Sequence, residues 1–189
     1  ALNERIKGNV AALQEKGVNP TLCIIRVGEN PSDISYEKGA TKKLTSFGLE
    51  VESKVFPVDI SDEAFKKEFA AINADASVDG ILMLRPLPKQ INEQDIEKMI
   101  DPAKDLDGIS PVNIAKVFSG DTSGFAPCTA EAVVCMLKMN DIALSGKRVA
   151  VVGRSMVVGR PLSMLLLHEN ATVTICHSRT ANLPEVCRE

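Results

Sequence analysis

The chain has 189 residues, of which 44% are hydrophobic and 25% are charged, a balance typical of a globular protein with a buried core. A formal net charge of −3 and the absence of a basic run give no electrostatic footprint for nucleic acid or an anionic membrane surface. No apolar run reaches the roughly 18 residues of a membrane-spanning helix, and the first residues do not have the pattern of a signal peptide. We therefore expect a cytoplasmic protein with small-molecule partners, no nucleic acid and no membrane.

The cysteines have no spacing typical of a metal site or of a disulfide framework. They are odd in number, include no CxxC pair and have no histidine at metal-ligand spacing. We expect no metal and five reduced thiols that lie mostly in the core: Cys23, Cys128, Cys135, Cys176 and Cys187.

The first part of the sequence alternates predicted helices with predicted strands. Apolar residues at helical spacing indicate an amphipathic helix that ends before Gly17, and a second helix is predicted to begin at the capping residue Ser61. Short apolar blocks bounded by turn residues indicate buried strands at 22–25, covered on both faces, and at 80–84. A strand at 51–56 and a helix at about 35–47 are also predicted. Such alternation specifies an α/β fold with parallel strands, whose ligands bind beyond the carboxyl ends of those strands.

The second part of the sequence repeats this alternation over a shorter length. A helix is predicted at 129–139, a strand at 148–152, a helix at 159–168 and a strand at 172–176. We therefore expect two α/β domains, the first over residues 1–125 and the second, a Rossmann-like dinucleotide-binding domain that is only partial here, over residues 126–189.

Two glycines between a predicted strand and a predicted helix suggest a nucleotide site. Gly153 and Gly159 lie where backbone N–H groups and the helix dipole can hold a pyrophosphate. Their spacing is not GxGxxG, so an interpretation as simple turn residues is equally good.

The end of the following predicted strand bears on which nucleotide would bind. NAD enzymes place a carboxylate there for the ribose 2′-hydroxyl, whereas this chain has Ser178 and Arg179. Together with Arg154 these side chains suit a 2′-phosphate, although the arginines could equally be solvated surface residues.

Two further features have both a functional and a structural interpretation. Asp105 and Asp107 are paired carboxylates suited to acid/base or ligand-binding work, but Asp-x-Asp-Gly is also ordinary turn chemistry. Tyr36, the only tyrosine, could stack on a flat ring or pack in the core.

Taken together, eight segments in order resemble the methylenetetrahydrofolate dehydrogenase/methenyltetrahydrofolate cyclohydrolase family. They are Val27-Gly28-Glu29-Asn30-Pro31, Tyr36, Asp79-Gly80-Ile81-Leu82, Pro86-Leu87-Pro88, Lys104-Asp105-Leu106-Asp107-Gly108, Pro127-Cys128-Thr129, Gly153-Arg154-Ser155 with Val158-Gly159-Arg160-Pro161, and Cys176-His177-Ser178.

The resemblance implies a homodimeric oxidoreductase of one-carbon metabolism that oxidises 5,10-methylenetetrahydrofolate with NADP. Residues 1–125 would be the folate-binding catalytic domain, with Tyr36 packed on the pterin ring and Asp107 bonded to its nitrogens as the catalytic pair. Pro86 and Leu87 would complete the substrate site. The cofactor would bind at Gly153, Arg154, Ser155, Gly159, Ser178 and Arg179.

The chain departs from the family pattern at two positions tied to the second, hydrolytic reaction. A lysine four residues after the tyrosine and a glutamine after the apolar strand are replaced by Ala40 and Leu84. We therefore expect weak or absent cyclohydrolase activity. Two alternatives remain. One is a multifunctional enzyme with full dehydrogenase and cyclohydrolase activities, and the other is a non-catalytic nucleotide-sensing module. Family members extend further at both ends, so we also expect this sequence to be part of a longer protein.

Overall fold

The structure, a computed structural model, describes residues 2–188 and forms two compact units that meet in sequence between Asp105 and Leu106. Both units contain parallel strands with helices packed on them, so the expected α/β class is confirmed. This division by packing differs from the domain boundary predicted from the sequence, which lies between residues 125 and 126. The predicted boundary between ligand-binding domains stays a prediction. Within residues 2–188, no helix combines the length and apolar character needed to span a bilayer.

The first unit is built on a three-stranded parallel sheet. Its central strand β1 (Thr21–Val27) lies between β2 (Glu50–Phe56) and β3 (Gly80–Met83), with Ile25 in register with Met83. All seven residues of β1 are buried. The continuous apolar block seen in the sequence therefore corresponds to a strand covered on both faces.

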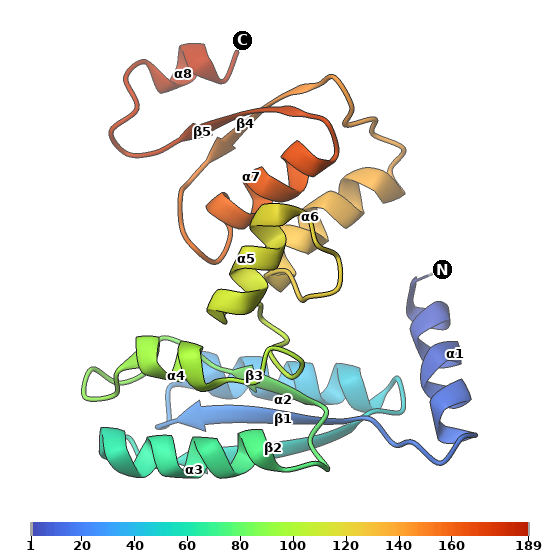
Figure 1. Cartoon of the computed structure of the whole chain (residues 1–189), viewed down its shortest axis with the longest axis vertical. Helices are drawn as coiled ribbons and strands as arrows, with labels where there is room; N and C mark the ends of the chain where they lie inside the picture. The colour runs from blue at the N-terminus through green and yellow to red at the C-terminus, as the bar shows by residue number, and fades with distance from the viewer. Residues whose placement is uncertain (1, 189) are drawn as a thin grey trace. The chain divides into compact units, whose positions relative to one another are not determined.

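Two helices cover opposite faces of this sheet. The chain passes from β1 through α2 (Pro31–Thr45) to β2, and then through α3 (Asp62–Ala74) to β3 on the other side of β1 (Figure 1). Right-handed crossovers in opposite directions place the two helices on opposite faces. The predicted cap of α3 is confirmed, because the Ser61 hydroxyl accepts the backbone N–H of Ala64 at 3.2 Å.

Two more helices belong to this unit. The predicted opening helix is present as α1 (Leu2–Gln14), but Val10 is its only buried residue among those described. Its apolar stripe is therefore mostly exposed in this structure. The helix α4 (Glu93–Met99) follows β3 and was not predicted.

The second unit has a two-stranded parallel sheet, β4 (Arg148–Val152) and β5 (Thr172–Cys176), joined by α7 (Gly159–His168). The helices α5 (Pro111–Ser119) and α6 (Cys128–Met139) pack against α7, and a short α8 (Leu183–Val186) follows β5. The core of this unit consists of Ala130, Val134, Leu144, Val151, Leu162, Leu166 and Ala171.

All five cysteines are free, as expected, but the prediction that most lie in the core is wrong. Only Cys23 and Cys176, each on a strand, are buried. Cys128 and Cys187 lie at helix ends, and Cys135 lies on a partly covered face of α6, so water reaches all three.

Candidate active site

The carboxyl ends of β1 and β3 lie side by side in the first unit. The backbone N–H of Leu84, just after β3, donates to the carbonyl of Ile25 at 2.9 Å. Gly28 follows β1 with a φ of 83°, a value that favours glycine, and turns the chain toward α2. The segments after both strands therefore meet at one edge of the sheet.

This edge carries the predicted substrate residues of the first unit. Tyr36 lies on α2 and its residue surface is 58% exposed, so the alternative of a core tyrosine is excluded. Pro86 is exposed and Leu87 is buried in the segment that follows β3. An exposed aromatic ring near the carboxyl ends of two parallel strands is suited to stacking on a planar ligand.

Both positions that depart from the family pattern are apolar and at least partly covered. Ala40 lies one turn after Tyr36 on α2 and is half-buried, and Leu84 is buried. Extending the β1–β3 register by one residue beyond Ile25 and Met83 sets Leu84 beside Arg26. Parallel partners share a face of the sheet, so Leu84 and Arg26 face the same layer.

A buried ion pair occupies that layer. The Nε of Arg26 donates to Oε2 of Glu37 on α2 at 2.7 Å, and its Nη1 donates to the carbonyl of Gly28. The two side chains are only 9% and 13% exposed. Burial acts to raise the pKa of Glu37, but hydrogen bonds from Ser53 and Arg26 outweigh it, and the pKa is lowered. Two nitrogens of the guanidinium are therefore bonded, Nε to a carboxylate and Nη1 to a backbone carbonyl.

A second ionic cluster holds the segment after β3. The Nη1 of Arg85 donates to Oε1 of Glu93 at 2.9 Å and to Oε1 of Glu97 at 3.2 Å. The other oxygen of Glu93 accepts the backbone N–H of Leu87 at 3.3 Å. Burial raises the pKa of Glu97, against the opposing charge of Arg85.

Asp107 lies at the start of the second unit and is half-buried, whereas Asp105, at the end of the first, is fully buried. The turn after Asp107 requires glycine, because Gly108 has a φ of 61° and a Cβ there would come within 2.6 Å of the Phe125 carbonyl. The interpretation of the Asp-x-Asp-Gly motif as a turn is therefore correct at its glycine, Gly108.

The thiol of Cys128 contacts the residues of the same turn. Its Sγ donates to the carbonyl of Leu106 at 3.1 Å. The residue as a whole is exposed, but burial of the sulfur, followed by the charges of Asp107 and Glu131, raises the pKa of the thiol. Cys128 therefore stays protonated at neutral pH, which suits a structural rather than a reactive thiol.

The loop between β4 and α7 depends on two glycines. Gly153 has a φ of 137°, and a Cβ there would meet nothing within 4 Å, so one side of the loop is open. A Cβ on Gly159 would collide with the Gly153 carbonyl, so glycine alone lets α7 begin this close to the strand. The Ser155 hydroxyl accepts the N–H groups of Val158 and Gly159 at 3.1 and 3.4 Å.

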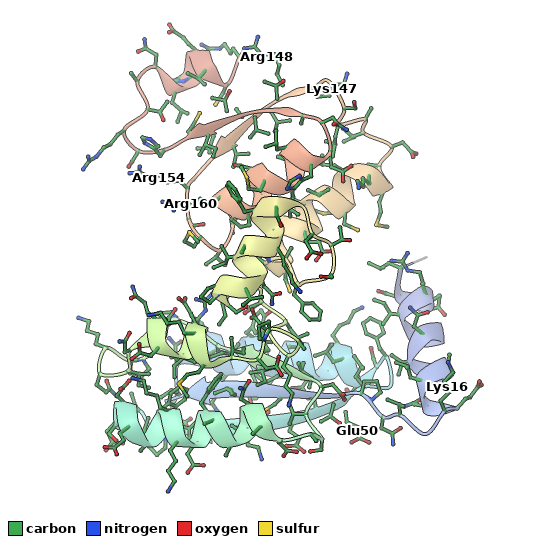
Figure 2. All side chains as sticks on the ribbon, in the orientation of Figure 1. Lys16, Glu50, Lys147, Arg148, Arg154 and Arg160 are labelled. Atoms are coloured by element: carbon green, nitrogen blue, oxygen red, sulfur yellow. The ribbon has the colours of Figure 1, made fainter. Side chains whose placement is uncertain are left out.

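This loop and the end of β5 form one edge of the second sheet. The N–H of Gly153 donates to the carbonyl of Cys176 at 2.8 Å, which brings the loop beside His177 and the residues after it. Arg160 donates from Nε to the carbonyl of Arg154 at 3.2 Å, and Figure 2 shows both arginines at this loop. The six predicted cofactor residues therefore all lie on the two segments that follow the paired strands β4 and β5: Gly153, Arg154, Ser155, Gly159, Ser178 and Arg179.

Comparison with protein families agrees with both units. Residues 1–107 match the model described as tetrahydrofolate dehydrogenase/cyclohydrolase, catalytic domain. Residues 127–189 match the model described as tetrahydrofolate dehydrogenase/cyclohydrolase, NAD(P)-binding domain. This chain belongs to the tetrahydrofolate dehydrogenase/cyclohydrolase family.

Individual members of the family are similar over the whole chain. The bifunctional protein FolD of Carboxydothermus hydrogenoformans is 51% identical over 189 residues, which cover 100% of this chain and 66% of that protein. The chain therefore spans just under two thirds of the length of such a relative.

Solved structures of family members have the same fold. The bifunctional FolD of Campylobacter jejuni superimposes with a TM-score of 0.95 at 35% identity, over 97% of this chain and 65% of that one. The enzyme of Trypanosoma brucei, solved with NADP and an inhibitor, gives 0.92 at 30% identity, over 98% of this chain and 64% of that one.

Sequence reasoning missed the residues that brace these loops: Arg26, Glu37, Arg85, Glu93 and Arg160. One signal was available, because a charged residue at position 26 interrupts the apolar block of a strand and needs a partner if it is buried. The identity of that partner cannot be read from the sequence.

Proposed function

We propose that the protein containing this chain is an NADP-dependent 5,10-methylenetetrahydrofolate dehydrogenase with weak or absent cyclohydrolase activity. The observation that carries this proposal is the pairing of family membership with apolar residues at Ala40 and Leu84. Arg26, which the strand register sets beside Leu84, is paired with Glu37.

The family resemblance supports a substrate role for four residues. Tyr36 would stack on the pterin ring, and Pro86 and Leu87 would contact the substrate from the segment after β3. Asp107 would accept hydrogen bonds from the pterin amino and ring nitrogens, because a carboxylate is an acceptor only.

The cofactor residues fit a dinucleotide with a 2′-phosphate. The open side of Gly153 and the start of α7 would receive the pyrophosphate, and Arg154, Ser178 and Arg179 would bind the 2′-phosphate. The NADP of the Trypanosoma brucei relative supports this assignment. Bound NADP supplies the hydride acceptor, and the residues of this chain orient the substrate toward it.

The two reactions of the family make different demands on the protein. Hydride transfer from the methylene bridge depends chiefly on positioning, because the methenyl product is a stabilised cation. Hydrolysis of that product needs a group that transfers protons, and such a group typically increases the reaction rate about 10² to 10⁴-fold. Alanine and leucine cannot do this, so the first reaction should persist while the second is depressed.

The test follows the decay of methenyltetrahydrofolate with and without the purified protein, and then with Ala40→Lys and Ala40→Lys plus Leu84→Gln. We expect the wild-type protein to form the methenyl chromophore with NADP but not to accelerate its decay. Rapid hydrolysis by the unmodified protein would refute the monofunctional assignment.

The bifunctional enzyme is the competing candidate, and the 51% identical relative named bifunctional favours it. The same decay assay separates the two. A homodimer and a cytoplasmic location also stay proposals, the former open to measurement by analytical ultracentrifugation.

The preference for NADP has its own test. A charge-assisted hydrogen bond contributes about 1.5 to 3 kcal/mol, so Arg154 should give roughly a 10- to 100-fold preference over NAD. Arg154→Gln should remove most of it, while Arg148→Gln, at the other end of β4, should not (Figure 2). Equal catalytic efficiency of the wild type with both cofactors would contradict the assignment.

A further inference from the structure

The segment between β3 and α4 is tied down at two places although it has no regular secondary structure. Near its far end, Nε2 of Gln90 donates to the carbonyls of Val58 and Ile60 at 2.7 and 3.2 Å. Near its start, the Glu93 carboxylate from α4 holds it. The two ties enclose Pro86 and Leu87, the residues that we assign to the substrate.

The Glu93 carboxylate bonds to both sides of Pro86. Its Oε1 accepts from the Arg85 guanidinium at 2.9 Å, and its Oε2 accepts the backbone N–H of Leu87 at 3.3 Å. Proline has no N–H of its own, so the Leu87 N–H is the first backbone donor after it. Each oxygen of Glu93 thus has its own donor.

The helix that carries Glu93 is itself fixed to α3. The backbone N–H of Asn92 donates to Oδ1 of Asp62 at 2.8 Å. Lys66 bridges Asp62 and Asp95 at 2.5 and 2.6 Å, and Ile96 of α4 is fully buried. Glu93 therefore transmits the position of a packed helix to the segment after β3.

We infer that Glu93 is a positioning residue for folate, which holds the Arg85–Leu87 backbone in the conformation that receives the pterin. This inference rests on the proposed function for the identity of the ligand. Glu93 does not contact the reacting atoms. Its loss should weaken folate binding and leave the chemical step and the NADP site unchanged.

Glu97 supplies a matched control on the same helix. It lies one turn after Glu93 and shares the partner Arg85, but it makes no bond to the Leu87 N–H. Glutamine at either position removes one negative charge and keeps one acceptor oxygen. That oxygen satisfies the single donor at position 97, whereas at position 93 two donors compete for it.

The experiment compares Glu93→Gln with Glu97→Gln by calorimetric titration with tetrahydrofolate and by steady-state kinetics. We expect Glu93→Gln to raise the dissociation constant for tetrahydrofolate and the KM for methylenetetrahydrofolate about three- to tenfold, the effect of one net hydrogen bond. The kcat and the KM for NADP should stay within about twofold. Hydrogen exchange at the Leu87 amide should accelerate in this variant alone, and Glu97→Gln should resemble the wild type in every measurement.

The outcomes separate the inference from the proposed function. Equal folate binding by the two variants, or an equal loss in both, overturns the positioning role of Glu93. A wild-type protein that binds tetrahydrofolate but forms no methenyl product overturns the proposed dehydrogenase, and the binding comparison still decides the role of Glu93. A wild type that binds no tetrahydrofolate overturns both.

Discussion

The Arg26–Glu37 pair shows how a single charged position in a strand is accommodated. Withdrawing two charges from water costs free energy, which close pairing and hydrogen bonds offset only in part. Here the partners lie 2.7 Å apart, and the Gly28 carbonyl and Ser53 provide further bonds. Such a pair contributes little net stability, but removing one member leaves a buried charge unpaired.

We predict that Arg26→Leu alone destabilises the protein by about 3–5 kcal/mol, because Glu37 is left unpaired. The double variant Arg26→Leu with Glu37→Val should recover most of this loss, since it removes both charges. Urea denaturation measures both free energies of unfolding. Additive losses in the double variant would contradict this account of the pair.

Glu97 gives a prediction for pH dependence. Its pKa is raised from the ordinary value of 4.5, so the folded protein retains this proton to a higher pH than the unfolded chain does. The stability that protonated Glu97 contributes is therefore complete below pH 4.5 and is lost as pH rises through the folded pKa. As pH rises through this range, the melting temperature of Glu97→Gln minus that of the wild type should increase. Scanning calorimetry of both proteins at several pH values measures this difference. A difference that does not vary with pH would contradict the raised pKa.

At the scale of elements, the start of α7 depends on the absence of one side chain. The Gly159 position lies close against the Gly153 carbonyl, and the Ser155 hydroxyl accepts the N–H groups of Val158 and Gly159. The nucleotide loop and the helix that follows it are therefore fixed by the same contacts.

We predict that Gly159→Ala destabilises the protein by about 1–3 kcal/mol through overpacking, and weakens NADP binding because the loop must move. Gly8→Ala is the matched control, since a Cβ on α1 there meets nothing within 4 Å. It should stabilise by up to about 1 kcal/mol. Thermal melts and calorimetric titration with NADP measure the two effects, and unchanged NADP binding by Gly159→Ala would count against NADP binding at this loop.

The elements that the sequence predicts are those fixed by local patterns. The strand at 148–152 and the helix at 159–168 match β4 and α7, and the apolar blocks match β1 and β3. The helix α4 was missed because it is one short stretch with a single buried residue, Ile96, and is held by ion pairs to α3. Pairs between residues far apart in the sequence leave no periodic signal.

The candidate site was predictable to a similar extent. Family motifs pointed to residues on loops after strands, and topology explains why these loops gather at sheet edges. The bracing contacts depend on which helix packs where, so Glu93 and Glu37 could not be assigned to Arg85 and Arg26 beforehand.

At the scale of the whole molecule, each unit has its own core. Phe65 and Phe69 are fully buried in the first, and Leu166 anchors the core of the second. Separate cores allow one unit to lose stability without the other.

We therefore predict that Phe69→Ala, which should cost about 3–5 kcal/mol, accelerates hydrogen exchange in residues 2–105. Leu166→Ala, at about 2–5 kcal/mol, should do so in residues 106–188. Mass spectrometry of peptic fragments measures both patterns. Acceleration spread evenly over both units by either variant would show that they unfold together.

Within these 189 residues, the exposed ring of Tyr36 is the one strong ultraviolet fluorophore. The sequence has one tyrosine and no tryptophan, so ultraviolet emission beyond that of phenylalanine comes from this one position on α2. A ligand that stacks on the ring should quench that emission, while binding elsewhere should leave it largely unaltered. This part of the protein can therefore report ligand stacking on Tyr36 through its own fluorescence, without an attached label.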